Sequence, residues 1–172
     1  MNYFELFDIP VQLKPDPGKV RKKFLELSRK YHPDYFVQQD NQLQQEALEN
    51  AAQLNKAYKV LSNEDAVIKY VLQEKGLMEE DEKFALPPDF LMEMMELNEA
   101  LAEAQMDGDE NAIAKTKQQL SNLEKEIYEP VKDIVEHYQE GITSEKELLQ
   151  VKAYYYKKKY LQRIALQMSQ KL

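Results

Sequence analysis

A histidine and an aspartate lie two residues apart in the segment His32-Pro33-Asp34. An imidazole beside a carboxylate can act as an acid–base pair in catalysis. The rest of the chain offers little to complete such a site, because its one other histidine is His137 and it has neither a cysteine nor a glycine-rich phosphate loop. The alternative is a turn in which Asp34 caps the segment that follows. From these three residues alone the turn is favoured over an enzyme.

The composition excludes several classes of protein. The 172-residue chain has no cysteine, which removes disulfides and any zinc or iron–sulfur site built on its own thiolates. Its formal charge of -8 argues against nucleic acid as the main ligand. No apolar run approaches the ~18 residues of a membrane span, and the N-terminus lacks the basic start of a targeting peptide. We therefore expect a cytoplasmic protein that needs no metal or cofactor and binds neither nucleic acid nor membrane.

A basic amphipathic helix must carry the tripeptide. Asp16-Pro17 is a typical helix start, and Pro33 prevents the helix from continuing past about Tyr31. The apolar stripe of this helix consists of Val20, Phe24, Leu27 and Tyr31. Its other faces carry the cations Lys19, Arg21, Lys22, Lys23, Arg29 and Lys30. A charged helix therefore ends in an exposed loop, an arrangement suited to contact with a partner.

Three further helices are predicted around this one. A short helix is expected over residues 3–7, and a long one with its own apolar stripe over residues 43–61. The pair Ser62 and Asp65 resembles a capping box and predicts the start of a short fourth helix. Because the two long helices have similar length and are joined by a turn, we expect an antiparallel hairpin.

Charge divides the chain into two parts. Residues 1–76 carry 11 basic and 11 acidic groups, whereas residues 77–172 carry 12 basic and 20 acidic groups. The change falls at Gly76, a residue type that often ends a helix, and an acidic segment with a pair of prolines follows it. We predict a first domain over 1–76, a linker over 77–87 and a second domain over 88–172.

The second domain is predicted to be an up-down-up bundle of three helices, which makes the chain all-α. The first helix is expected to start at the cap Asp89 and to end near Asp107-Gly108. The second is expected over residues 109–138, with a kink at Pro130. A capping box of Ser144 and Glu147 predicts the start of the third, which continues to the C-terminus.

The first helix of the bundle has two different apolar faces. Phe90, Met94 and Leu97 follow helical spacing and are expected to face the core. Leu91, Met92 and Met95 lie on adjoining faces, and Glu96, Glu99 and Glu103 continue that outer surface. Flexible apolar side chains beside carboxylates are typical of a protein-binding patch. A helix that is buried over a broad face is the alternative.

The first domain resembles the J-domain of J-type co-chaperones. The segments YFELF, KVRKKFLELSRKYHPD and LNKAYKVLS follow one another in the order and spacing of that family. The resemblance implies a helical hairpin with two short helices, whose HPD loop and basic helix face engage an ATP-bound chaperone of the DnaK class and trigger its ATP hydrolysis. The implied trigger is His32, Pro33 and Asp34. The implied docking cations are Arg21, Lys22, Lys23, Arg29 and Lys30.

The whole chain resembles the HscB family of iron–sulfur cluster biogenesis, because an acidic three-helix domain containing FLMEMMEL follows the J-domain directly. The resemblance implies a co-chaperone, not an enzyme, that delivers an iron–sulfur scaffold protein of the IscU type to a chaperone of the HscA type. The implied scaffold contacts are Leu91, Met92, Met95, Glu96, Glu99 and Tyr156. Met95 and Tyr156 stand where relatives often carry Leu and Phe, and both preserve bulk. A J-protein for another client and a non-catalytic helical adaptor are the alternatives.

Overall fold

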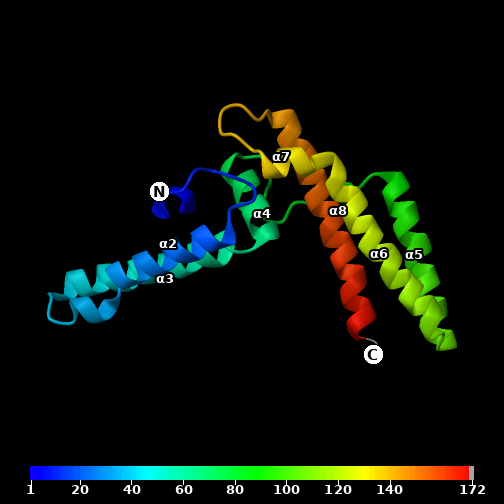
Figure 1. Cartoon of the computed structure of the whole chain (residues 1–172), viewed down its shortest axis with the longest axis horizontal. Coiled ribbons are helices and arrows are strands. Elements are labelled where there is room, and N and C mark those ends of the chain that lie inside the picture. Colours follow the sequence, from blue (N-terminus) through cyan, green and yellow to red (C-terminus); the bar gives the residue numbers. More distant parts are fainter. Residues whose placement is uncertain (171–172) are drawn as a thin grey trace. The chain divides into compact units, whose positions relative to one another are not determined.

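The computed structural model describes residues 1–170, which form helices joined by loops (Figure 1). Contacts within the chain divide it into two compact units. The first is Met1–Gly76 with Val135–Ile142, and the second is Leu77–Ile134 with the chain from Thr143 onward. Over the described range the structure has no β-strand, so the all-α prediction is confirmed. The division into 1–76, 77–87 and 88–172 stays a prediction, and its residues 171–172 lie outside the described range.

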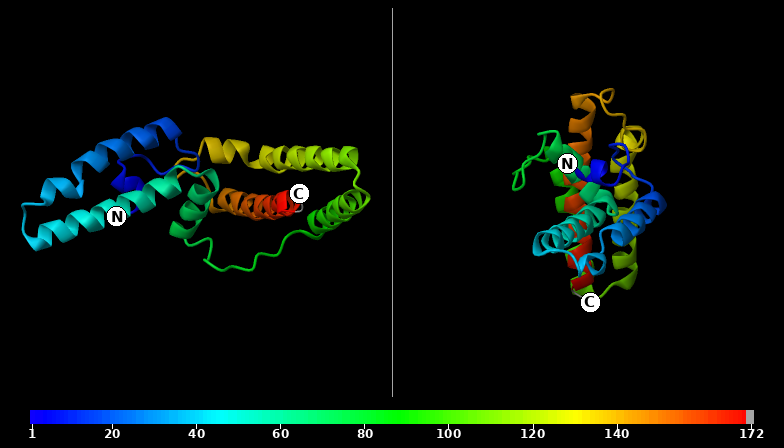
Figure 2. Two further views of the ribbon diagram at one scale, coloured as in Figure 1. Left: turned by 90° about the horizontal axis from the view of Figure 1, so that it is seen from below. Right: turned by 90° about the vertical axis from the view of Figure 1, so that its left-hand side faces the viewer.

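The first unit is a helical hairpin with short helices beside it. Its elements are α1 (Tyr3–Leu6), α2 (Pro17–Lys30), the 3-10 turn η1 (Pro33–Phe36), α3 (Asn41–Leu61) and α4 (Glu64–Glu74). Helices α2 and α3 run side by side in opposite directions, which confirms the predicted hairpin (Figure 2). The η1 turn lies at the end of the hairpin where α2 passes into α3.

Aromatic contacts hold the elements of the first unit together. The rings of Phe24 on α2 and Tyr58 on α3 stack with their centroids 4.1 Å apart. Tyr3 on α1 stacks on Tyr70 of α4 at 4.5 Å, and its backbone N–H donates to the Tyr70 hydroxyl at 2.9 Å. Stacked aromatic pairs contribute beyond the apolar area that they bury. The hairpin and the two short helices therefore share one packed core.

The helix caps of the first unit were only partly predicted. Asp16 caps α2 as expected, because its carboxylate accepts from two backbone N–H groups of the first turn. Ser62 does not begin α4. It closes α3, where its hydroxyl donates to the Tyr58 carbonyl at 2.6 Å. Asn63 caps α4 by accepting from the Ala66 N–H at 2.9 Å, and Asn is as good an N-cap as Ser.

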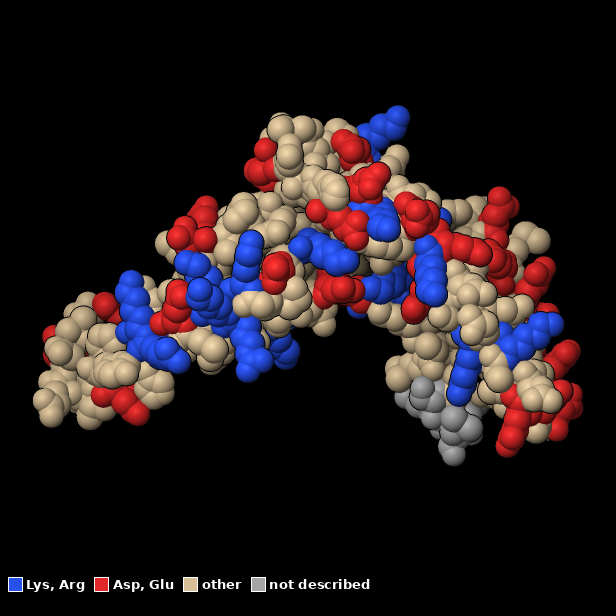
Figure 3. Space-filling model, in the orientation of Figure 1, with Lys and Arg blue, Asp and Glu red and all other residues tan. Residues whose placement is uncertain are grey.

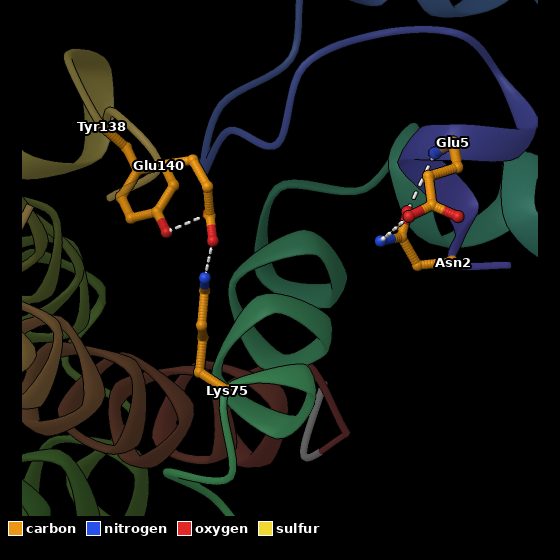
Figure 4. A network of polar contacts seen from close by, with 5 residues as sticks. All are labelled: Asn2, Glu5, Lys75, Tyr138 and Glu140. Atoms are coloured by element: carbon orange, nitrogen blue, oxygen red, sulfur yellow. Dashed lines mark hydrogen bonds and ion pairs between the residues drawn. The ribbon is translucent and has the colours of Figure 1, made fainter. Parts of the chain in front are cut away.

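The segment Val135–Ile142 belongs to the first unit although it is distant in sequence. Glu140 accepts hydrogen bonds from the Lys75 ammonium just after α4 and from the Tyr138 hydroxyl, the latter at 2.6 Å (Figure 4). Tyr138 is itself buried. A paired carboxylate and a buried ring thus attach this segment to the hairpin unit, which the sequence analysis did not foresee.

The second unit is a bundle of three long helices. Its elements are α5 (Pro88–Asp107), α6 (Glu110–Tyr128), the 3-10 turn η2 (Glu129–Val131), α7 (Lys132–Glu136), of which the last residues lie in the first unit, and α8 (Glu145–Gln170). Helices α5, α6 and α8 pack along one another, as predicted (Figures 1 and 2). Their core consists of Phe90, Met94, Leu97, Leu101, Leu120, Leu123, Leu161, Ile164 and Met168.

Two details of the bundle differ from the prediction. Asp89 is not a cap, because α5 starts directly after Pro87, and Asp89 lies in its first turn. The continuous helix expected over residues 109–138 is broken at Pro130 into α6, η2 and α7, which ends at Glu136. Proline lacks the N–H for the next helical hydrogen bond and its ring clashes with the preceding turn. The α-helical pattern is therefore interrupted by a 3-10 turn at the proline where the kink was predicted.

The predicted capping box at the start of α8 is confirmed. The Glu147 N–H donates to the Ser144 hydroxyl at 3.1 Å, and the Ser144 N–H donates to the Glu147 carboxylate at 3.0 Å. These reciprocal bonds satisfy two backbone donors that a helix start leaves unpaired. Local sequence alone therefore determines where this helix begins.

Candidate functional site

The His32-Pro33-Asp34 segment forms a capped turn. The Asp34 N–H donates to His32 Nδ1 at 3.2 Å, and the Tyr35 N–H donates to the His32 carbonyl at 3.1 Å. His32 and not Asp34 is therefore the N-cap of η1, which corrects the sequence-based alternative. Because Nδ1 accepts this bond, the neutral imidazole carries its proton on Nε2. The exposed histidine thus keeps one donor for a partner.

The catalytic interpretation of the turn finds little support. The side chains of His32 and Asp34 are 53% and 83% exposed, and His32 Nδ1 lies 3.6 Å from the Asp34 carboxylate. Catalytic pairs are usually placed in clefts, where burial and charge partners adjust their pKa values. An imidazole and a carboxylate on an open surface are instead accessible to a protein partner.

The predicted docking cations follow α2 toward the turn. Arg21, Lys22, Arg29 and Lys30 are exposed. Lys23 is half-buried and lies 3.9 Å from the Asp8 carboxylate, a distance at which an exposed ion pair contributes little. Lys and Arg side chains gather over α2 in the space-filling view (Figure 3). The basic face and the turn therefore form one continuous surface of the first unit.

The predicted scaffold residues of α5 share one exposed face of that helix. Met92 and Met95 are 62% and 58% exposed, and Leu91 is half-buried. Glu96 and Glu99 are exposed beside them. Because the core residues of α5 lie on the opposite face, the broadly buried helix of the alternative is not what the second unit contains. We call Leu91, Met92, Met95, Glu96 and Glu99 the α5 patch.

Tyr156, the sixth predicted scaffold residue, has different neighbours. Its ring stacks on Phe84 with centroids 4.6 Å apart, and its hydroxyl donates to Glu82 at 3.1 Å. Lys152 donates to the same carboxylate at 2.8 Å. Burial, and then the hydrogen bond to Glu82, raise the pKa of Tyr156 to about 12. The structure thus packs Tyr156 against the segment that precedes α5, on a different set of contacts from the α5 patch.

Tyr160 of α8 contacts α5. Its ring meets Phe90 edge to face with centroids 6.1 Å apart, and it is half-buried at the margin of the core. Tyr160 was not among the predicted site residues, because α8 carries several tyrosines of similar spacing. The available signal was its position one helical turn after Tyr156, but only packing distinguishes the two.

Comparison with known proteins covers both units. A family model described as a DnaJ domain matches residues 2–70, and one described as an HSCB C-terminal oligomerisation domain matches residues 86–168. Co-chaperone protein HscB homologs from Aliivibrio salmonicida and Vibrio vulnificus strain CMCP6 are 36% and 38% identical over 137 residues, which is 74% of this chain and 80% of each relative. The chain belongs to the HscB family.

Solved HscB structures agree with this assignment. Chaperone HscB from Vibrio cholerae superposes with a TM-score of 0.75 at 26% identity, covering 99% of this chain and 96% of that one. Human co-chaperone protein HscB gives a TM-score of 0.80 at 26% identity, with 99% and 82% coverage. The DnaJ-domain match includes the HPD turn, and the C-terminal match includes the α5 patch. The two candidate surfaces of this HscB-family chain therefore lie in its two matched regions.

Residues 1–170 lack two further kinds of feature. No cluster of three or more His, Cys, Asp or Glu side chains in that range has the arrangement of a metal site. Nor is any helix there both long and apolar enough to cross a bilayer.

The Glu82 network of this HscB-family chain predicts a pH dependence of stability. The hydrogen bond from Lys152 lowers the pKa of Glu82 from its ordinary value of 4.5, and Tyr156 adds to this effect. A carboxylate whose pKa is depressed by folding stabilises the fold above its unfolded pKa, and this contribution is lost as pH falls through the folded pKa. We therefore expect Glu82→Gln to lower the melting temperature at pH 7 by about 2 °C, with a smaller difference below pH 4.5.

Thermal unfolding of the full chain, followed by circular dichroism at several pH values, measures this difference. Glu79→Gln is the matched control, because Glu79 is an exposed acid of the same acidic segment. A Glu82→Gln difference that is equal at pH 7 and pH 3 would contradict the assigned pairing.

Proposed function

We propose that this protein is a co-chaperone of iron–sulfur cluster biogenesis. It binds a scaffold protein of the IscU type, delivers it to a DnaK-class chaperone of the HscA type, and stimulates ATP hydrolysis by that chaperone. The observation that carries the proposal is an exposed, capped HPD turn at the end of a basic helix, in a chain of the HscB family. The protein is not itself an enzyme in this proposal, and it acts in the cytoplasm.

The first unit would supply the chaperone contact. His32, Pro33 and Asp34 form the trigger, and the cations of α2 orient the approach. Exposed ion pairs contribute only ~0.2–1 kcal/mol each. Complementary charge mainly accelerates encounter and selects the orientation of docking. The geometry supports this division, because a capped turn follows a helix with a row of exposed cations.

The second unit would hold the client. The α5 patch combines exposed methionines with carboxylates and supports binding of a folded protein surface. Tyr156 remains the predicted aromatic of α8, and Tyr160 is a second candidate because it contacts α5. Tethering client and trigger in one chain raises the effective concentration of the client at the chaperone. The cluster itself is cargo of the scaffold, since this chain has no thiolate to bind it.

Single-turnover ATP hydrolysis tests the proposal. The chaperone is loaded with ATP and mixed with this protein, the scaffold, or both. We expect this protein alone to accelerate ATP hydrolysis. When the scaffold is also present, we expect a lower concentration of this protein to give the same acceleration. Absence of acceleration by the wild-type chain would rule out the J-domain mechanism. Acceleration that no scaffold enhances would favour a J-protein for another client.

Truncation of Met95 is expected to weaken scaffold binding. Apolar anchors at the centre of an interface typically lose about 1–2 kcal/mol on substitution by alanine. Leu91→Ala should act in the same direction. Met106→Ala is the matched control, because Met106 lies on the same helix, is 87% exposed and stands outside the α5 patch.

Isothermal titration calorimetry with the scaffold measures the three affinities. Circular dichroism spectra of the variants should match that of the wild type. If Met95→Ala and Met106→Ala bind equally well, the client lies elsewhere on the second unit.

A further inference from the structure

A groove lies between α5 and α6 of the second unit. Its volume is about 450 Å³, within the range of grooves that hold part of a ligand. Each helix contributes residues at positions i, i+3, i+4 and i+7, which form two facing stripes. The lining residues are Glu93, Glu96, Leu97 and Ala100 from α5, and Gln119, Asn122, Leu123 and Glu126 from α6.

The floor and the walls of this groove differ in chemistry. Leu97 and Leu123 form an apolar floor and belong to the core of the bundle. The walls carry the carboxylates of Glu93, Glu96 and Glu126, all exposed. Among the described residues none of the three forms an ion pair with a cation of the chain. The groove therefore presents three unpaired negative charges above an apolar surface.

The lining favours a peptide segment. No group of carboxylates within residues 1–170 meets the arrangement of a metal site. Seven residues of helix span about 10 Å, which matches about three residues of extended chain. The amides of Gln119 and Asn122 can pair with a peptide backbone, and the carboxylates can pair with Lys or Arg. The matching ligand is a short cationic segment with an apolar side chain.

The groove adjoins the α5 patch, which indicates that the protein bound at the patch also supplies this segment. Glu96 belongs both to the patch and to the wall of the groove. Glu93 precedes it by one turn on the same helix. A partner seated on Met92 and Met95 thus has the groove directly beside it, within reach of an adjoining loop.

We propose that the α5–α6 groove binds a Lys- or Arg-containing segment of the same scaffold protein that occupies the α5 patch. The inference rests on the proposed function and extends it to α6, which the family resemblance did not implicate. Unlike-charge contacts at such an interface fix the register of the partner and accelerate association. The α6 wall then selects the client by charge, while the methionines of α5 supply apolar contact area.

Charge reversal on α6 tests the groove. In Glu126→Lys the wall repels a cation, and we expect the full-length chain to bind the scaffold about tenfold more weakly. Glu124→Lys is the matched control. Glu124 is exposed on the same helix two residues earlier, and it lines the opposite side of α6, next to α8. Its reversal changes net charge equally and should alter the affinity less than about twofold.

Calorimetric titration at two salt concentrations distinguishes the outcomes. The groove is supported if only Glu126→Lys loses affinity for the scaffold, and if the affinity of that variant depends less on salt than the affinity of the wild type does. Equal losses in both variants would show a general effect of net charge and overturn the assignment. Unchanged affinity in both would leave the α5 patch as the client site and remove the groove. A wild-type chain that fails to bind the scaffold would overturn the proposed function as well.

Light scattering of each variant without the scaffold completes the test. If Glu126→Lys alone changes the oligomeric state of this protein, a second copy occupies the groove and the scaffold does not. An unchanged oligomeric state together with the selective loss of scaffold affinity supports the assignment made here.

Discussion

Replacing His32 by glutamine is expected to reduce chaperone ATP hydrolysis to the rate of the chaperone alone. The imidazole caps the η1 turn through Nδ1, with the Asp34 N–H at 3.2 Å. A glutamine side chain is longer and more flexible, and it has no ring nitrogen at the Nδ1 position. Loss of the cap removes the bond that holds the turn, and the exposed ring donor of the imidazole is replaced by an amide donor at a different position. Both effects act on the trigger rather than on the fold, because the turn is exposed.

His137→Gln is the control for this prediction. It makes the same chemical change at the one other histidine of the chain, which is also exposed and lies in the Val135–Ile142 segment of the first unit. Single-turnover rates at saturating co-chaperone should remain at the wild-type level for His137→Gln. Full stimulation by His32→Gln would show that the HPD turn is not the trigger.

Replacing Met94 by alanine is expected to lower the free energy of unfolding by roughly 2–5 kcal/mol. The Met94 side chain is 0% exposed and belongs to the core shared by α5, α6 and α8. Its truncation removes the transfer free energy of the buried atoms and leaves a cavity that the packed neighbours fill only in part. The expected loss is large because it affects all three helices of the bundle.

Met92→Ala is the control for Met94→Ala, because Met92 lies on the same helix two residues earlier. Met92 is 62% exposed, so its truncation should change the free energy of unfolding by no more than about 0.5 kcal/mol. Urea unfolding of the full chain, followed by far-UV circular dichroism, measures both values. Similar losses for Met92 and Met94 would mean that α5 does not present the face assigned to its patch.

Local sequence determined several helix boundaries of this protein. Asp16 with Pro17, and Ser144 with Glu147, mark helix starts because their side chains satisfy backbone donors of the next turn. Gly108 ends α5 in the left-handed conformation that glycine adopts without strain. Apolar spacing on α5 also separated buried from exposed side chains, since helical period alone decides which face a residue occupies. The basic face of α2 and the exposed face of α5 were predicted on this basis, whereas the role of the HPD turn and the residues of the α5 patch were implied by the family resemblance.

Where two local signals competed, only the structure decided between them. Ser62 and Asn63 are adjacent residues that can both cap a helix. In the structure Ser62 is the C-cap of α3 and Asn63 is the N-cap of α4. Pro130 predicted a bend, and the structure shows that the 3-10 turn η2 separates α6 from α7 there. Capping strength is similar among these side chains, so the outcome depends on where the neighbouring helix must end.

Contacts between residues distant in sequence were decided by tertiary structure alone. The attachment of Glu140 to Lys75, the stacking of Tyr156 on Phe84, and the α5–α6 groove all join segments that no periodicity relates. The periodicity of apolar residues predicts which face of its helix a side chain occupies. It does not predict which residue of another element that side chain contacts. The sequence by itself thus determined the HPD turn and its helix, because both depend on neighbours within a few residues. Tertiary packing decided that Tyr160 of α8 meets Phe90 of α5 and that a groove forms between α5 and α6, because both depend on how separate helices are brought together.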